Sequence, residues 1–338
     1  MNQPTTSEHT NSSATETTHY SPLTTYSFAQ PLVEFRGVSK WYGPVIGVNE
    51  VSFEVRPGIT GMLGPNGAGK TTLIKLLAGQ LRPSLGDVRV CGLPAWSAAA
   101  RRHVGYCPDA DAFYEDMSGR QFVRSMARLH GFDRATAKRR TEEVLAEVGM
   151  AARADRRLRG YSKGMRQRIK MAQALVHDPD VIVVDEPLNG VDPVGRREFM
   201  DLFRDLGRRG KALLISSHIL DEMDTLAERV LFMGRGRVLA VGTLPEIRDM
   251  LDNHPLKLRV ETDRARDLAS RLVHWELVRS VELHDAHELL LEIYRPDQFF
   301  RRFSDLVLEE AFEIERLQTT DASAGAIFDY VMQEAARF

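Results

Sequence analysis

The sequence predicts an α/β protein with a mostly parallel sheet covered by helices on both faces, followed by a small α+β domain. Apolar runs of strand length alternate with helix signals as far as about residue 245, which is typical of a parallel sheet. A glycine-rich loop at Gly64–Thr71 lies between a strand signal and a helix signal. After a break near Pro245–Pro255 the order changes to strand, helix, two strands, helix, strand, as in a split βαβ (ferredoxin-like) domain.

The composition argues against a nucleic-acid-binding, membrane-spanning or secreted protein. The 338 residues are enough for two domains with a full core. A net charge of −2 offers no basic field for nucleic acid, so no nucleic-acid partner is expected. No apolar run approaches the roughly 18–20 residues that span a bilayer, and the N-terminus lacks a secretory pattern. Cys91 and Cys107 show neither a disulfide nor a metal-binding spacing. We therefore expect a cytoplasmic protein.

Three regions are expected along the chain. Residues 1–30 are rich in Ser and Thr and poor in large aliphatic residues, which predicts a disordered tail. Residues 31–245 form the main domain, with a helical subdomain at about 110–165, where Ser118 and Asp133 are candidate N-caps. Residues 255–338 form the accessory α+β domain with an appended helix.

The glycine-rich loop matches the pattern GxxxxGK[ST] at every fixed position. Its glycines allow backbone amides to surround a phosphate, and the helix that follows points its positive end at the same charge. Lys70 is expected to reach the β- and γ-phosphates, and Thr71 to offer its hydroxyl to Mg²⁺. The candidate phosphate-binding residues are Gly64, Asn66, Gly67, Gly69, Lys70, Thr71 and Thr72.

Acidic residues follow the apolar run Val181–Val184, which predicts a buried strand ending at the ligand edge of the sheet. Asp185 is placed to hold Mg²⁺ through water, and Glu186 to orient and polarise an attacking water. His218 comes just after the next strand, where a ring nitrogen could donate to the γ-phosphate. Asp192, in the loop after the acids, could cross a subunit boundary. The alternative for the acidic pair is a solvated strand end.

The segment Tyr161-Ser162-Lys163-Gly164-Met165 supplies a second phosphate grip. A small hydroxyl residue and a glycine at a helix start can bind a phosphate. Because the loop at Gly64–Thr71 already binds one, the second grip implies a nucleotide presented by another subunit.

This ordered set of motifs resembles the ATP-binding cassette family over about residues 32–245. The resemblance implies the P-loop NTPase fold of the family's nucleotide-binding domain, ATP and Mg²⁺ as cofactors, and two ATP molecules in a head-to-tail dimer. It also implies that Tyr42 stacks on adenine, and that Ser162 and Gly164 contact the ATP of the opposite subunit. The dimer is expected to be a homodimer or a heterodimer with a related cassette.

The chain departs from the family pattern at two places. The common signature is Leu-Ser-Gly-Gly-Gln, whereas this chain has Lys163 as an added positive charge and Met165 in place of an amide. The form Tyr-Ser-Lys-Gly-Met looks like that of the drug-resistance and polysaccharide-export branch. Asp109 lies where the family has its Q-loop glutamine; an aspartate could still reach Mg²⁺ through water.

The resemblance implies an ATPase subunit of a transporter, expected to be an exporter, working on separate transmembrane permease chains at the inner face of the cell membrane. Glu186, His218 and Lys70 are the expected catalytic residues, and the helical subdomain is expected to meet the permease. Two alternatives stay open: a soluble non-transport ATPase of the same family, and a regulatory module that binds ATP but hydrolyses it weakly. An arginine cluster at residues 153–159 is interpreted as a solvated face, with a nucleic-acid or lipid contact as the alternative.

Overall fold

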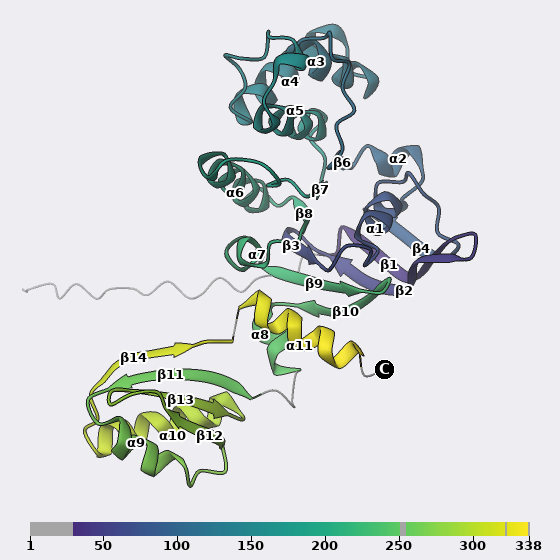
Figure 1. Ribbon diagram of the computed structural model, residues 1–338. Coiled ribbons are helices and arrows are strands. Elements are labelled where there is room, and N and C mark those ends of the chain that lie inside the picture. The colour runs from purple at the N-terminus through teal and green to yellow at the C-terminus, as the bar shows by residue number, and fades with distance from the viewer. Residues whose placement is uncertain (1–29, 251–254, 322, 337–338) are drawn as a thin grey trace, which may run out of the picture. The chain divides into compact units, whose positions relative to one another are not determined.

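The computed structural model describes residues 30–250, 255–321 and 323–336 (Figure 1). The tail predicted to be disordered lies outside the described residues except for Gln30. The described helices and strands are given below with their bounds.

A six-stranded sheet forms the centre of the main domain. Its five parallel strands lie in the order β9, β3, β8, β7, β6, and β10 joins β9 antiparallel. This confirms the predicted mostly parallel sheet. Every residue of β7 is buried, because helices pack on both of its faces. The strands are β3 (Gly58–Leu63), β6 (Val104–Cys107), β7 (Val181–Asp185), β8 (Ala212–Ser217), β9 (Arg229–Gly234) and β10 (Arg237–Gly242).

A second, antiparallel sheet has the strand order β2-β1-β4-β5. The sequence pattern predicted a single mostly parallel sheet for this domain and did not separate this second sheet from it. Helix α1 (Lys70–Leu77) shares one apolar core with both sheets. The phosphate loop therefore begins a helix that is held between two sheets. The strands are β1 (Val33–Tyr42), β2 (Val45–Val55), β4 (Leu85–Val90) and β5 (Leu93–Pro94).

A helical subdomain contains α3 (Gly119–Leu129), α4 (Arg134–Glu147) and α5 (Lys163–Leu175), with a 3₁₀ turn at Leu158–Gly160. Both predicted N-caps are confirmed. The Ser118 hydroxyl accepts from the Gln121 amide at 3.2 Å and the Gln121 side chain accepts from the Ser118 amide at 2.9 Å, which forms a capping box. The remaining helices of the main domain are α2 (Ala98–Arg101), α6 (Pro193–Arg208), α7 (Leu220–Leu226) and α8 (Leu244–Asp249).

The C-terminal elements follow the predicted βαββαβ order. Their four strands form an antiparallel sheet in the order β12-β13-β11-β14 with an apolar core of its own. The elements are β11 (Leu256–Thr262), α9 (Ala265–Leu272), β12 (Val278–Leu283), β13 (Glu288–Ile293), α10 (Pro296–Glu309) and β14 (Ile314–Thr319).

The last helix, α11 (Ala324–Ala336), packs on the main domain. Its buried residues Ala324, Ile327 and Val331 belong to the core that includes β8 and α7. By its internal contacts Pro31–Phe338 is one unit, so the division of the chain near 245–255 stays a prediction.

The capping box predicts a measurable contribution to stability. Ser118→Ala removes the cap of α3 and should lower the free energy of unfolding by about 1 kcal/mol, measured by urea denaturation. Ser125→Ala on the same helix is the matched control, since the Ser125 hydroxyl bonds only the preceding turn and leaves no helix-end amide unsatisfied. Equal stability of the two variants would show that the box contributes nothing.

Candidate active site

The glycine-rich loop joins β3 to α1 as the sequence predicts. Gly69 is the N-cap of α1 with φ 101°, and Gly67 has φ 82°, a region that residues with a Cβ rarely enter. The Lys70 ammonium donates to the carbonyl oxygens of Gly64 at 2.5 Å and Pro65 at 3.4 Å. Burial lowers the pKa of Lys70, while the negative charges of Glu186 and Asp185 oppose that shift.

A cavity of about 450 Å³ lies at the mouth of this loop. It brings together residues from four separate parts of the sequence: the β1–β2 turn, the loop, the segment after β6, and the end of β7. The lining residues are Tyr42, Val45, Ile46, Gly47, Pro65, Asn66, Gly67, Ala68, Gly69, Lys70, Thr71, Thr72, Asp109, Asp185 and Glu186. Tyr42 is 45% exposed, so its ring is accessible for stacking. Most candidate residues named from the sequence therefore face one space.

Asp185 is the most buried of the cavity's carboxylates. Burial raises the pKa of Asp185, and the negative charges of Glu186 and Asp109 raise it further. The Ser216 hydroxyl, which donates to Asp185 Oδ1 at 2.6 Å, acts in the opposite direction and lowers the pKa. The Ser216 oxygen also accepts from the Glu186 amide at 3.0 Å. Ser216 thus holds both acids, a role that the sequence analysis missed. The signal was its place at the end of β8, in register with Asp185.

Glu186 and His218 form a pair at the edge of the cavity. The His218 Nδ1 lies 2.6 Å from Glu186 Oε2, and 17% of the Glu186 side chain is exposed against 53% of the His218 side chain. Glu186 has φ 50°, a conformation that is uncommon for a residue with a side chain and is found at functional sites. The pair joins a carboxylate to an imidazole that can position it. The contact of His218 with a γ-phosphate stays a prediction.

The oxygen donors around the cavity fit a hard divalent cation. Asp185, Asp109 and the exposed Thr71 hydroxyl line the same space, and oxygen ligands are those that Mg²⁺ prefers. The neighbouring negative charges that raise the pKa of Asp185 would be relieved by a bound cation. Thr71, Asp185 and Asp109 are therefore the residues that could hold Mg²⁺.

The signature segment lies outside the described lining of this cavity. Ser162 caps α5 and accepts from the Met165 amide at 3.3 Å, while Tyr161 is buried and donates to the Arg153 carbonyl oxygen at 3.0 Å. Met165 packs in the core, which accounts for an apolar residue at that position. A Cβ added to Gly164 would meet no atom within 4 Å. The start of α5 is therefore held by the buried side chains of Tyr161 and Met165, while the space next to Gly164 is open.

One side chain, Lys163, connects this region to the loop after β7, and Asp192 lies in that loop. The Lys163 ammonium lies 3.5 Å from Asn189 Oδ1. Asp192 caps α6 and accepts from the amides of Val194 at 3.1 Å and Gly195 at 3.0 Å. These bonds lower the pKa of Asp192, and the bond from the Gly195 amide has the largest effect. Its carboxylate has a structural role in this chain, and its predicted contact across a subunit boundary stays a prediction.

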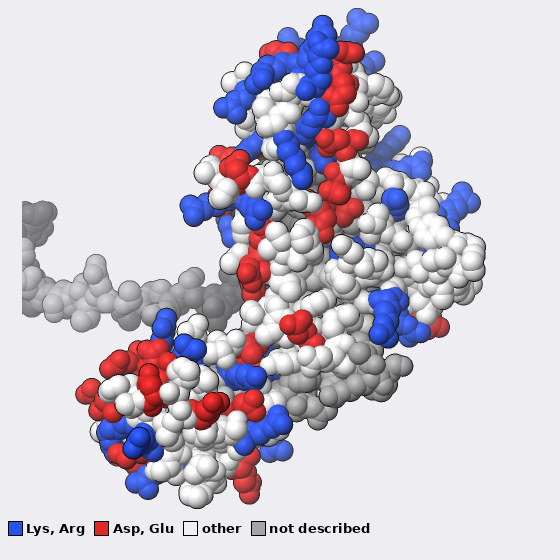
Figure 2. Space-filling view, in the orientation of Figure 1, with Lys and Arg blue, Asp and Glu red and all other residues white. Residues whose placement is uncertain are grey.

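The arginine cluster before the signature is largely paired. Arg157 and Arg159 each lie 3.4 Å from Asp116, and Arg156 donates to the Gly160 carbonyl oxygen. Figure 2 shows basic and acidic side chains interspersed over the helical subdomain. These pairs favour the solvated face over a nucleic-acid or lipid contact.

Comparison with known proteins identifies the family. The family profile described as "ABC transporter" matches residues 48–189. The chain is 35% identical over 280 residues to the daunorubicin/doxorubicin resistance ATP-binding protein DrrA of Streptomyces peucetius, covering 81% of this chain and 84% of that protein. It is 38% identical to the Nod factor export ATP-binding protein I of Burkholderia orbicola, covering 62% of this chain and 70% of that protein.

A solved structure described as the ATP-binding subunit of an ABC transporter superposes with a TM-score of 0.60 at 29% identity, covering 65% of this chain and 92% of the other. Within the described residues, no helix has the length and apolar character needed to cross a membrane. The family's cassettes hydrolyse ATP, and this chain carries the loop, the acids and the histidine in the family's order. The chain therefore belongs to the ABC transporter family, as one of its ATP-binding and ATP-hydrolysing subunits.

Proposed function

We propose that this chain powers export: two copies, or one copy and a related cassette, would close over two ATP molecules and drive a separate transmembrane permease. The observation that carries this proposal is the division of the site. One cavity joins the loop, Asp185 and Glu186, whereas Ser162 and Gly164 start α5 with open space before them. The names of two relatives, a drug-resistance protein and an export protein, support export as the direction.

Hydrolysis would depend on positioning and charge. Lys70 and Mg²⁺ would neutralise the phosphates, with the metal held by Thr71 and, through water, by Asp185 and Asp109. Glu186 would accept the proton of the attacking water as general base, oriented by the 2.6 Å contact with His218. The partner's Ser162 and Gly164 would cover the γ-phosphate from the opposite side.

Hydrogen bonds and ion pairs join the segment after β6 to α5, the helix that begins after Ser162. A movement of the nucleotide-binding residues would reach α5 through them. From α5, the buried Lys170 donates to the Asp109 carbonyl oxygen at 2.6 Å and lies 3.2 Å from Asp111 Oδ1. Arg166 on the same helix makes two bonds to Glu115, at 2.7 and 2.8 Å. The segment after β6, which brings Asp109 to the cavity, is thus fastened to α5 at both ends. A displacement of Asp109 would move the helix that presents Ser162.

The permease would dock on a groove between the main sheet and the helical subdomain. This groove encloses about 500 Å³ and opens beside Leu129, which is 78% exposed. A partner helix that laid its apolar face in this groove would bury the exposed Leu129 side chain. Bound there, the chain would lie at the inner face of the cell membrane. The lining residues are Ala78, Gln80, Ala98, Arg101, Arg102, Val104, Tyr106, Met126, Leu129, His130, Gly131, Gln173, Ala174 and His177.

Glu186→Gln should keep ATP binding but lower turnover at least about a hundredfold, because the amide cannot accept the proton of the attacking water. The measurements are steady-state phosphate release and equilibrium ATP binding. Light scattering should also show an ATP-dependent dimer that persists. Glu313→Gln makes the same charge change at an exposed residue of the C-terminal elements and should act as wild type. Near-normal turnover of Glu186→Gln would remove this residue from its proposed role.

Ser216→Ala should shift the acid limb of the ATPase pH profile to higher pH. The Ser216 hydroxyl donates to the Asp185 carboxylate and so favours the charged form. Without it the pKa of Asp185 rises further above its ordinary value, and the carboxylate needed for Mg²⁺ is protonated at higher pH. The Mg²⁺ concentration for half-maximal activity should rise as well.

Ser217→Ala is the control for that variant. The Ser217 hydroxyl accepts from the Ile219 amide at 3.0 Å and holds neither acid. An acid limb that is the same in both variants would contradict the role assigned to Ser216.

Leu129→Glu should weaken docking of the permease, since a carboxylate at the groove rim would have to be desolvated on binding. The measurement is the recovery of a polytopic membrane protein with affinity-tagged chain from detergent-solubilised membranes. Leu308→Glu on α10 is the matched control, because Leu308 is equally exposed, at 80%. Equal recovery with the two variants would exclude the groove as the docking site.

A further inference from the structure

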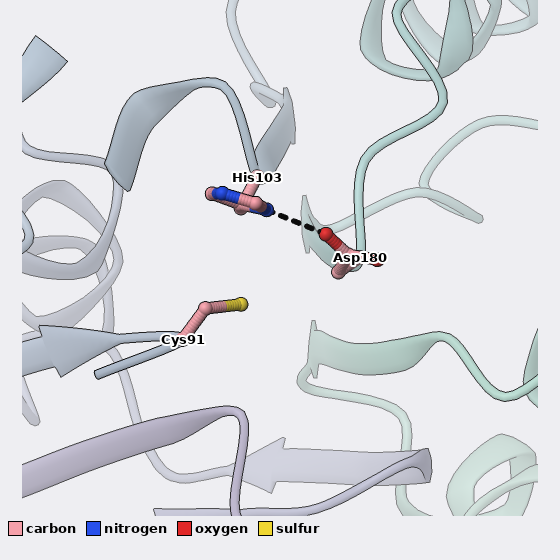
Figure 3. A group of neighbouring side chains, drawn as sticks. All are labelled: Cys91, His103 and Asp180. Atoms are coloured by element: carbon pink, nitrogen blue, oxygen red, sulfur yellow. Dashed lines mark hydrogen bonds and ion pairs between the residues drawn. The ribbon is translucent and has the colours of Figure 1, made fainter. Parts of the chain in front are cut away.

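Three side chains with metal-binding atoms meet at the edge of the central sheet opposite the nucleotide cavity. Cys91 follows β4, His103 precedes β6 and Asp180 precedes β7. One ligand atom from each lies within 4.8 Å of the other two, and the His103 Nδ1 is 2.6 Å from Asp180 Oδ2. Figure 3 shows the Cys91 sulfur turned toward the His103–Asp180 pair. Among the described residues, no other three His, Cys, Asp or Glu side chains bring their ligand atoms this close together.

The fold places these residues together through backbone contacts. Strands β6 and β7 are parallel, with Val104 in register with Val181, and the Val181 amide donates to the His103 carbonyl oxygen at 2.9 Å. The two residues that precede these strands therefore lie side by side. Cys91 comes from the other sheet, in a tight turn where its φ is 49°, and its amide donates to the Leu32 carbonyl oxygen at 2.7 Å. The arrangement does not depend on long flexible side chains.

We propose that Cys91, His103 and Asp180 bind a divalent transition-metal ion of the zinc type. Thiolate, imidazole and carboxylate are the ligands that Zn²⁺ takes at roughly 2.0–2.3 Å, and three protein ligands leave a fourth, tetrahedral position for water. Ligand atoms around such an ion are roughly 3.5 Å apart. The three groups therefore need only small side-chain rotations to enclose it. One thiolate and one carboxylate also balance the charge of the ion.

The site would connect the two sheets of the main domain. Cys91 lies in the turn between β4 and β5 of the antiparallel sheet, while His103 and Asp180 directly precede β6 and β7 of the central sheet. Strand β7 separates Asp180 from Glu186, so the metal would lie roughly 17–20 Å from the nucleotide cavity. Its expected effect is therefore on the stability of the fold rather than on the chemistry of ATP.

Two simpler roles for these residues are a bare His–Asp ion pair with a bystander thiol and a reactive cysteine. Burial, and then the charge of Asp180, raises the pKa of the Cys91 thiol, which argues against a reactive thiolate. With an ion pair alone, the Cys91 side chain would serve only to pack against the apolar core, although its sulfur is turned toward the His103–Asp180 pair. A metal would account for all three groups, displacing the thiol proton as it binds.

The test uses the purified full-length chain with Co²⁺ as the probe, because cobalt bound to a thiolate has a charge-transfer band that Zn²⁺ then abolishes by displacement. We expect this band in the wild type with one ion per chain. Cys107→Ser is the matched control, since Cys107 is the chain's other cysteine and is buried. It should keep the band, whereas Cys91→Ser should lose it.

Two further measurements distinguish loss of the site from loss of the fold. Asp180→Asn should weaken Zn²⁺ binding by more than the roughly 10–100-fold that loss of an outer-shell partner costs, and Zn²⁺ should raise the melting temperature of the wild type but not of Cys91→Ser. ATP binding should be unchanged in both variants. Absence of a thiolate band in the wild type, or equal zinc binding by wild type and Cys91→Ser, would overturn the proposal.

Discussion

The parallel pairing of β3, β8 and β7 is the constraint on which the site depends. With Leu63 in register with Ser217, and Asp185 with Ser216, the carboxyl ends of three strands meet at one edge. The phosphate loop, the two acids and the segment that carries His218 therefore converge although they are far apart in the sequence. Parallel strands impose this meeting because each must return through a crossover on the face of the sheet.

At that edge, Ser216 connects the Asp185 side chain to the Glu186 backbone. Its hydroxyl donates to the Asp185 carboxylate and accepts from the Glu186 amide, so the metal-binding acid and the proposed base are fixed by one group. Glu186 keeps a left-handed backbone conformation, which places its carboxylate against His218. The chain's own contacts thus fix the positions of these two acids, as positioning catalysis requires.

Much of the fold followed from local patterns in the sequence. The alternation of strand and helix signals predicted the parallel sheet, and Ser118 and Asp133 marked two helix starts, because caps and buried strands leave short-range signals. The separate antiparallel sheet was not predicted, since the pairing of β1 with β4 joins residues some fifty positions apart and has no local signature.

The sequence predicted those site residues that belong to a recognisable motif. It did not predict residues that reach the site only through the register of neighbouring strands. The loop, Asp185 and Glu186 were found from their spacing, whereas Ser216 acts through its place beside β7. Cys91 and His103 likewise have no motif spacing with Asp180, and only the strand order brings them together. The bonds from Lys170 and Arg166 to the segment after β6 are side-chain contacts across elements, which no single-sequence pattern encodes.

The central claim is that Ser162 of one chain covers the nucleotide held by the loop of another. Its most direct test mixes a chain carrying Asn66→Cys with a chain carrying Ser162→Cys, both also carrying Glu186→Gln and Cys91→Ser, and adds a short thiol cross-linker. Asn66 and Ser162 are both exposed. The account predicts a cross-linked dimer that forms only in the mixture and only with ATP. A yield in the mixture that ATP does not change, or equal yields from either chain alone, would contradict it.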